Sequence, residues 1–134
     1  MTTLVLVPGL LSDATVWKPL ADAAAGRFGI HVADISGGTS ITGMAETILD
    51  ETDGPLIVAG HSMGGRVAME MARIAPDRVR GLVLANTGHH PKREGEEIKR
   101  QAMIDLGHES MGKLAAQWLP PMLDPARTED KKLM

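Results

Sequence analysis

The sequence predicts an α/β fold, in which a parallel sheet of about four strands carries helices on both faces and is followed by a helical segment. Short apolar runs alternate with segments whose apolar residues recur at helical spacing, and the connections between them are short. In residues 58–65, one apolar run leads into a glycine-rich turn and then into a helical segment. Such an alternation places ligand-binding loops at the carboxyl ends of the strands.

Two apolar runs and the helix between them predict the first half of the sheet. Residues 3–7 form a continuous apolar run that a Pro-Gly pair ends. Either Ser12 or Asp13 is placed to cap a helix over residues 15–25, whose apolar residues share one face. Residues 30–35 form the second predicted strand, which ends at a Ser-Gly-Gly turn.

The second half of the sheet is predicted in the same way. Residues 42–51 have an apolar helical face and end at an Asp-Gly-Pro turn. Residues 55–59 are a short apolar run of the kind that is buried in a parallel sheet. Residues 66–75 alternate apolar and charged side chains at helical spacing, and residues 79–85 form the fourth strand.

The character of the chain changes at His89, so we expect two parts: residues 1–88 as the α/β core and residues 89–134 as a helical lid or cap segment. Helices are expected over residues 96–106 and 110–119, and a Pro-Pro pair ends the second of them. Residues 127–132 are charged and are expected to be exposed.

Composition excludes several classes of function. The chain has 134 residues, of which 43% are apolar and 23% charged, with a formal net charge of −3, as in an ordinary globular protein. Mild acidity and the lack of a Lys/Arg cluster argue against a nucleic-acid partner. With no cysteine there are no disulfides or thiolate metal sites, and we expect no metal or cofactor. The first apolar run is too short for a signal peptide or a membrane span, so we expect a cytoplasmic protein that does not bind membranes.

The stretch Gly60-His61-Ser62-Met63-Gly64 is a G-x-S-x-G pattern between a predicted strand and a predicted helix. A tight strand-to-helix turn lifts a serine hydroxyl clear of the backbone, at the cost of a sparsely populated conformation. Bulkier side chains at Gly60 and Gly64 would collide with the turn. The N–H groups of the following helix point to where negative charge would develop. The competing interpretation is a glycine-rich turn with an incidental serine.

Over nearly all of its length the chain resembles the α/β-hydrolase family. Residues 4–17 resemble the family's first shared strand, its oxyanion loop and the tryptophan that opens the next helix, with Pro-Gly in place of the common His-Gly. Residues 34–40 resemble the Asp-x-x-Gly-x-Gly-x-Ser loop, one residue short. Residues 60–65 resemble the nucleophile elbow, and residues 75–84 resemble the run after the nucleophile helix.

The resemblance implies an enzyme that acts as a serine hydrolase, most plausibly on a small-molecule carboxylic ester. Ser62 would be the nucleophile, and the backbone N–H groups of Leu10 and Met63 would form the oxyanion hole. The reaction would be acyl transfer to water through an acyl-serine. The alternative is a non-catalytic module that binds a small acyl ligand or a partner in the same pocket. Nucleotide binding is disfavoured, because neither G-x-G-x-x-G after a strand nor G-x-x-x-x-G-K-[ST] occurs.

The family also needs an acid and then a histidine, on loops after later strands. In the right order this chain offers Asp105 and His108, three residues apart on one predicted helix, where a solvated helix face is the competing interpretation. His89 and His90 are expected to line the pocket or to lie exposed in a loop, whereas the two histidines at positions 31 and 61 are expected to be structural.

We therefore expect the chain to be the amino-terminal part of a longer hydrolase, truncated before the acid and the histidine, rather than a shortened protein with little hydrolytic activity. The fourth strand would then have an open edge, through which we expect homo-oligomers to form.

Overall fold

A computed structural model describes residues 1–127, 129 and 130. The chain divides into two compact units, Met1–His89 and His90–Met134. The sequence places this division one residue earlier, and the role of the second unit as a lid stays a prediction.

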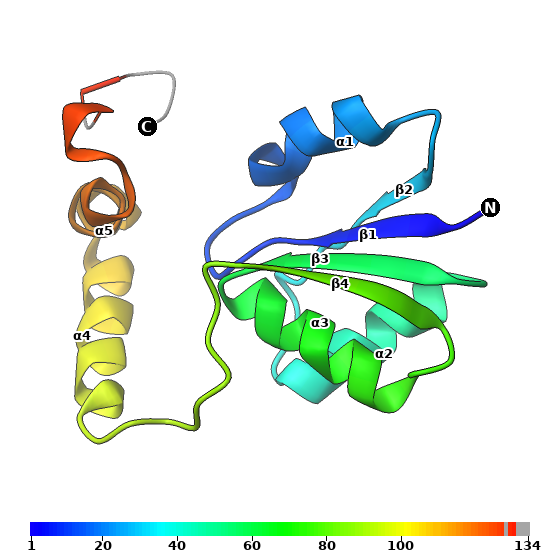
Figure 1. The fold of residues 1–134 in the computed structure, drawn as a ribbon. Helices are drawn as coiled ribbons and strands as arrows, with labels where there is room; N and C mark the ends of the chain where they lie inside the picture. The colour runs from blue at the N-terminus through cyan, green and yellow to red at the C-terminus, as the bar shows by residue number, and fades with distance from the viewer. Residues whose placement is uncertain (128, 131–134) are drawn as a thin grey trace. The chain divides into compact units, whose positions relative to one another are not determined.

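The first unit is built on a four-stranded parallel sheet with the strand order β2-β1-β3-β4 (Figure 1). This confirms the predicted α/β fold class. Val5 in β1 pairs with Val58 of β3 on one side and with His31 of β2 on the other. The strands are β1 (Thr3–Val7), β2 (Gly29–Val32), β3 (Leu56–His61) and β4 (Val79–Ala85).

Helices cover both faces of the sheet, and the alternation of side chains along β1 divides the core between them. Val5 and Val7 face the cluster beneath α2 (Ile41–Glu51) and α3 (Met63–Ile74). Leu4 and Leu6 face the opposite cluster, together with Trp17 and Ala24 of the segment that contains the 3₁₀ helix η1 (Ala14–Trp17) and α1 (Lys18–Ala24).

Several boundaries differ from the sequence prediction, including three in the first unit. The first helix begins as a 3₁₀ turn capped by Asp13, whose carboxylate accepts a bond from the Thr15 N–H, because Pro19 has no N–H for an α-helical bond to Thr15. Strand β2 stops at Val32, and the Asp34 carboxylate then accepts bonds from Ser36 that turn the chain. Helix α3 already begins at Met63, although its next two residues are glycines with low helix propensity.

The second unit contains α4 (Glu96–Glu109) and α5 (Met111–Trp118), followed by the 3₁₀ helices η2 (Pro120–Met122) and η3 (Pro125–Arg127). Helix α4 is longer than expected, because it continues through Gly107 to Glu109. The lack of a side chain at Gly107 allows the buried Leu114 of α5 to pack closely against it. Ser110 caps α5 by accepting a bond from the Lys113 N–H. Of the charged stretch expected to be exposed, Arg127 is exposed, while residues 128, 131 and 132 lie outside the described residues. No helix within the described residues has both the length and the apolarity to cross a membrane.

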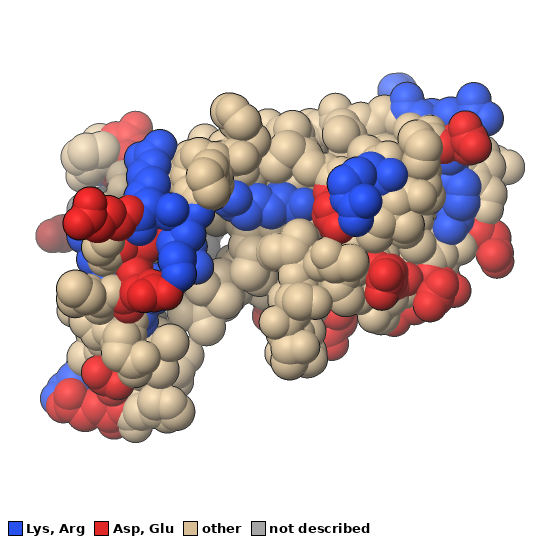
Figure 2. All heavy atoms as spheres, turned by 90° about the horizontal axis from the view of Figure 1, so that it is seen from below, with Lys and Arg blue, Asp and Glu red and all other residues tan. Residues whose placement is uncertain are grey.

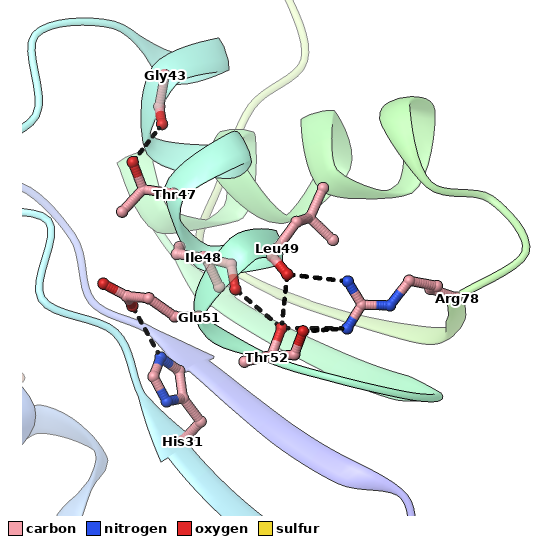
Figure 3. A network of polar contacts seen from close by, with 8 residues as sticks. All are labelled: His31, Gly43, Thr47, Ile48, Leu49, Glu51, Thr52 and Arg78. Carbon is pink, nitrogen blue, oxygen red and sulfur yellow. Dashed lines mark hydrogen bonds and ion pairs between the residues drawn. The ribbon is translucent and has the colours of Figure 1, made fainter.

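Arg78, in the turn before β4, binds the carboxyl end of α2 (Figure 3). Its guanidinium donates to the carbonyl oxygens of Leu49 at 2.9 Å, Thr52 at 2.7 Å and Gly54 at 3.0 Å. The carbonyl groups at a helix end have no partner within the helix, and a cation there also complements the helix dipole. One side chain thus joins the end of α2, the turn into β3 and the start of β4.

Glu70 links α3 to the amino-terminal turn of α2, whereas Arg78 binds the carboxyl end of that helix. Its carboxylate accepts two bonds from Arg73, at 2.9 and 2.7 Å, and one from the Thr42 hydroxyl at 2.9 Å. These bonds, with that of Arg73 the strongest, lower the pKa of Glu70 to about 2. Over the surface of α2 and α3, acidic and basic side chains are interspersed among uncharged ones (Figure 2).

Among the described residues, β4 lies at one edge of the sheet and pairs with no strand other than β3. Its apolar side chains are largely exposed, by 40% at Leu82, 53% at Val83 and 45% at Leu84. An apolar edge strand is a place where another chain can pair. The homo-oligomer expected from the sequence stays a prediction.

We expect Arg78→Met to lower the free energy of unfolding by about 2–3 kcal/mol, because three carbonyl groups lose a charged donor. Urea unfolding followed by circular dichroism measures this change. Arg80→Met is the matched control, since Arg80 is an exposed arginine on β4, and it should change stability by less than about 0.5 kcal/mol. Equal effects of the two substitutions would contradict the role of Arg78.

A second prediction concerns acid stability. Because folding lowers the pKa of Glu70 from 4.5 to about 2, this carboxylate stabilises the fold above pH 4.5, and its contribution is lost as the pH falls towards 2. In Glu70→Gln, the free energy of unfolding should therefore fall less steeply between pH 5 and pH 2.5 than in the unmodified protein. Denaturant titrations at several pH values measure both slopes, and identical slopes would show that the prediction is wrong.

Candidate active site

Ser62 lies at the junction of β3 and α3, where it is the N-cap residue of α3. Its backbone angles are φ 54° and ψ −120°, which are neither helical nor extended. A non-glycine residue in such a conformation costs about 1–3 kcal/mol and persists only where its surroundings impose it. The residue is exposed at the end of a buried strand. The local fold therefore presents this side chain to solvent at the carboxyl edge of the sheet.

The two glycines on either side of Ser62 allow main-chain segments to touch. A Cβ atom on Gly60 would lie 2.2 Å from the Gly64 carbonyl oxygen. A Cβ atom on Gly64 would lie 2.2 Å from the carbonyl oxygen of Val7 and 2.5 Å from that of Pro8. Because these obstacles are backbone atoms of adjoining elements, neither collision can be relieved by a change of rotamer. The G-x-S-x-G spacing thus corresponds to direct packing of α3 on the ends of β3 and β1.

The loop after β1 lies directly against Ser62. A Cβ atom on the buried Gly9 would be 3.1 Å from the Cβ of Ser62 and 3.3 Å from Nδ1 of His61. The Ser12 N–H donates to the Gly9 carbonyl at 3.2 Å and closes the turn, in which Leu11 has φ 59°. Leu10 is the next residue after Gly9, so its N–H group lies in the segment that contacts Ser62. Its role as an oxyanion-hole donor stays a prediction.

Met63 is the first residue of α3, so its N–H group is one of those without an acceptor inside the helix. The positive end of the helix dipole adds to the attraction for negative charge at this point. The arrangement brings an exposed hydroxyl, a free helix N–H and a main-chain turn together, which suits the stabilisation of an oxyanion. The role of the Met63 N–H as the second donor of the oxyanion hole also stays a prediction.

Two residues that hold Ser62 were not assigned a role from the sequence, namely Ala85 at the end of β4 and Thr87 just after it. The Ser62 N–H donates to the Ala85 carbonyl at 3.0 Å, and the Thr87 hydroxyl donates to the Ser62 carbonyl at 2.6 Å. Asn86, between them, has φ 45°. A signal in the sequence is the glycine that directly follows the serine pattern, Gly65, against which Thr87 packs.

The histidines of the first unit have different surroundings. His61 is half-buried, and its Nδ1 has no hydrogen-bond partner among the described residues. In β2, Nε2 of His31 lies 3.3 Å from a carboxylate oxygen of Glu51 (Figure 3) but is not aligned for a hydrogen bond. His89 is exposed, in the stretch that follows β4. Among the described residues, none of these histidines donates to or accepts from the Ser62 hydroxyl.

The remaining sequence candidates lie in the second unit or are committed to other bonds. Asp105 and His108 are exposed residues of α4, and Asp105 accepts a bond from Gln101 at 2.9 Å. Nδ1 of His90 lies 3.0 Å from the carbonyl oxygen of the next residue. In the first unit, bonds from the Ser36 hydroxyl and N–H lower the pKa of Asp34, which is therefore an ionised carboxylate that shapes its own loop.

Comparison with known proteins identifies one family. Residues 2–109 match the family model described as alpha/beta hydrolase fold. Among curated proteins, a pimeloyl-[acyl-carrier protein] methyl ester esterase of Yersinia enterocolitica is 35% identical over 92 residues, which are 63% of this chain and 36% of that protein. A putative carbamate hydrolase, RutD, of Azorhizobium caulinodans is 29% identical over 136 aligned positions, covering 90% of this chain and 51% of that protein.

A similar fold occurs among solved structures. A thermophilic esterase from Thermogutta terrifontis superposes with a TM-score of 0.77 at 25% identity, covering 98% of this chain and 54% of that one. The chain spans about a third to a half of the length of the curated relatives that it matches.

The glycine contacts yield a prediction. Gly64→Ala places a methyl group 2.2 Å from a main-chain oxygen of β1, so we expect it to lower the free energy of unfolding by about 2–3 kcal/mol. The control is Gly37→Ala, because a Cβ atom at Gly37 would meet nothing within 4 Å. Urea unfolding of both variants tests the idea, which fails if Gly64→Ala is as stable as the control.

Proposed function

The chain belongs to the alpha/beta hydrolase fold family, and from this premise we propose that it is a serine hydrolase that cleaves carboxylic esters. In this proposal Ser62 is the nucleophile, and the N–H groups of Leu10 and Met63 form the oxyanion hole. The observation that carries the proposal is the conformation of Ser62, with φ 54° at the N-terminus of α3 and an exposed side chain.

The proposed reaction proceeds in two halves. Oγ of Ser62 adds to the ester carbonyl carbon while its proton passes to a general base, and the tetrahedral oxyanion accepts bonds from the two N–H groups. The bond to the alcohol then breaks, the alcohol takes the proton, and an acyl-serine remains. Water repeats the sequence and releases the carboxylic acid. We assign no residue of the described chain to the role of the base.

Two observations favour esters as the substrate class. The curated relatives include a protein named as a methyl ester esterase, and the solved structures include an esterase. The side chains of Leu10 and Leu11, exposed by 50% and 57%, provide apolar surface next to the proposed oxyanion hole. Such a surface suits the apolar part of an acyl or alcohol group. We therefore propose a small-molecule ester as the partner of this site.

The alternative function is binding of a small acyl ligand without turnover. It is favoured by one observation, that the hydroxyl of Ser62 makes no hydrogen bond to a base among the described residues. Without a base a serine hydroxyl stays protonated and is a poor nucleophile. Turnover of a short activated ester distinguishes the two functions, since the binding module would not hydrolyse it.

Labelling with a fluorophosphonate tests the proposed nucleophile. In the full-length protein we expect the probe to modify Ser62, and Ser62→Ala to abolish labelling and lower ester turnover at least about a thousandfold. Ser36→Ala is the matched control, because Ser36 is an exposed serine in the loop after β2; it should label normally. Mass spectrometry of the labelled peptide identifies the site. A full-length protein that is neither labelled nor active on esters would refute the proposal.

A further inference from the structure

We propose that Thr87 is a positioning residue for the active serine: its hydroxyl fixes the peptide group that joins Ser62 to Met63. This inference rests on the proposed role of Ser62 as the nucleophile. Thr87 lies in the loop after β4, and its Oγ1 is 2.6 Å from the carbonyl oxygen of Ser62. The sequence separation of the two residues is 25, so nothing in the local chain brings them together.

Fixing the Ser62 carbonyl also fixes the direction of the next N–H group. The peptide bond between Ser62 and Met63 is trans and planar, so its C=O and N–H groups point in opposite directions within one plane. The carbonyl also accepts from Gly65 within α3, so a donor that holds it there keeps the Met63 N–H pointing away from the body of the helix, as the proposed oxyanion hole requires. Thr87 thus acts on the proposed oxyanion hole through the main chain, without contact with the substrate.

The serine is held from three directions. Its carbonyl accepts a second bond, from the Gly65 N–H at 3.0 Å, and its own N–H donates to Ala85 at 3.0 Å. Two of the three bonds involve the residues on either side of Asn86, namely Ala85 at the end of β4 and Thr87 in the loop after it. The left-handed conformation of Asn86, φ 45°, bends the chain as it leaves β4. Asparagine tolerates this region better than most side chains do, so the bend is compatible with the sequence.

The Thr87 side chain is itself held in place. A Cβ atom on Gly65 would lie 2.5 Å from both Cβ and Oγ1 of Thr87 and 2.6 Å from its Cγ2. The threonine therefore occupies the volume that a side chain at residue 65 would need. This packing restricts the rotamer of Thr87 and aims the hydroxyl at the serine carbonyl, and it gives a physical reason for the glycine that directly follows the serine pattern.

The loss of the hydroxyl should affect reactivity more than folding. Without Thr87 Oγ1, the Ser62 carbonyl keeps its bond to Gly65, so the turn at the start of α3 persists. The peptide plane is then held by one bond instead of two, and the strained conformation of Ser62 can relax. A small rotation of the Met63 N–H away from the oxyanion weakens transition-state stabilisation strongly, because the donor must meet the developing charge closely.

The test uses three variants of the full-length protein. Thr87→Val keeps the shape of the side chain but loses the hydroxyl, and Thr87→Ser keeps the hydroxyl. Thr47→Val is the matched control, because Thr47 also donates to a main-chain carbonyl, that of Gly43 at 2.9 Å within α2 (Figure 3). The second-order rate constant of fluorophosphonate labelling should fall about tenfold or more in Thr87→Val. It should stay within about threefold of the unmodified protein in the other two variants.

Thermal unfolding and amide hydrogen exchange at Ser62 and Met63 accompany the labelling. We expect faster exchange of these two amides in Thr87→Val and little change in the midpoint of unfolding. Labelling of Thr87→Val at the unmodified rate, or labelling of Thr87→Ser as slow as that of Thr87→Val, would overturn the inference. An unmodified protein that does not label would refute the proposed function. In that case unchanged amide exchange in Thr87→Val would separately show that Thr87 does not fix the Ser62–Met63 peptide group, and faster exchange would support that it does.

Discussion

Contact between main-chain atoms of α3 and β1 is the constraint on which the rest of the first unit depends. The start of α3 packs so closely on the carboxyl end of β1 that even one methyl group at Gly64 would meet carbonyl oxygens. Such an approach brings the helix N-terminus to the sheet edge without intervening side chains. It forces the connecting residue, Ser62, into its strained conformation and leaves its side chain exposed.

The same constraint determines what can surround the serine. The loop after β1 reaches it through the buried Gly9, and the end of β4 and the loop after it make two hydrogen bonds to its main chain. Three strand ends therefore meet at one peptide group. A site of this kind is preorganised by backbone atoms, which move less than side chains do, and the chemistry can rely on donors that are fixed before a substrate arrives.

The sequence predicted those features that depend on local patterns. Apolar runs and helical spacing were sufficient for the strand and helix order, and the serine pattern predicted the tight strand-to-helix turn at Ser62 and the close packing at its flanking glycines. What the sequence did not reveal depends on partners distant in the chain. The bonds of Thr87 and Arg78 were not predicted, because they reach residues more than twenty positions away. Boundaries shifted where Pro19 changed the start of a helix, an effect that periodicity alone does not measure.

The bonds of Arg78 have a consequence for the order in which the chain assembles. They connect groups 24 to 29 residues apart and need the end of α2, the following turn and the approach to β4 to be in place together. Closing such loops is entropically costly, so we expect these bonds to form after more local structure has formed. An interaction made after the rate-limiting barrier slows the escape from the native state rather than hastening its formation. We therefore expect the arginine to contribute to the lifetime of the folded molecule more than to the speed with which it folds.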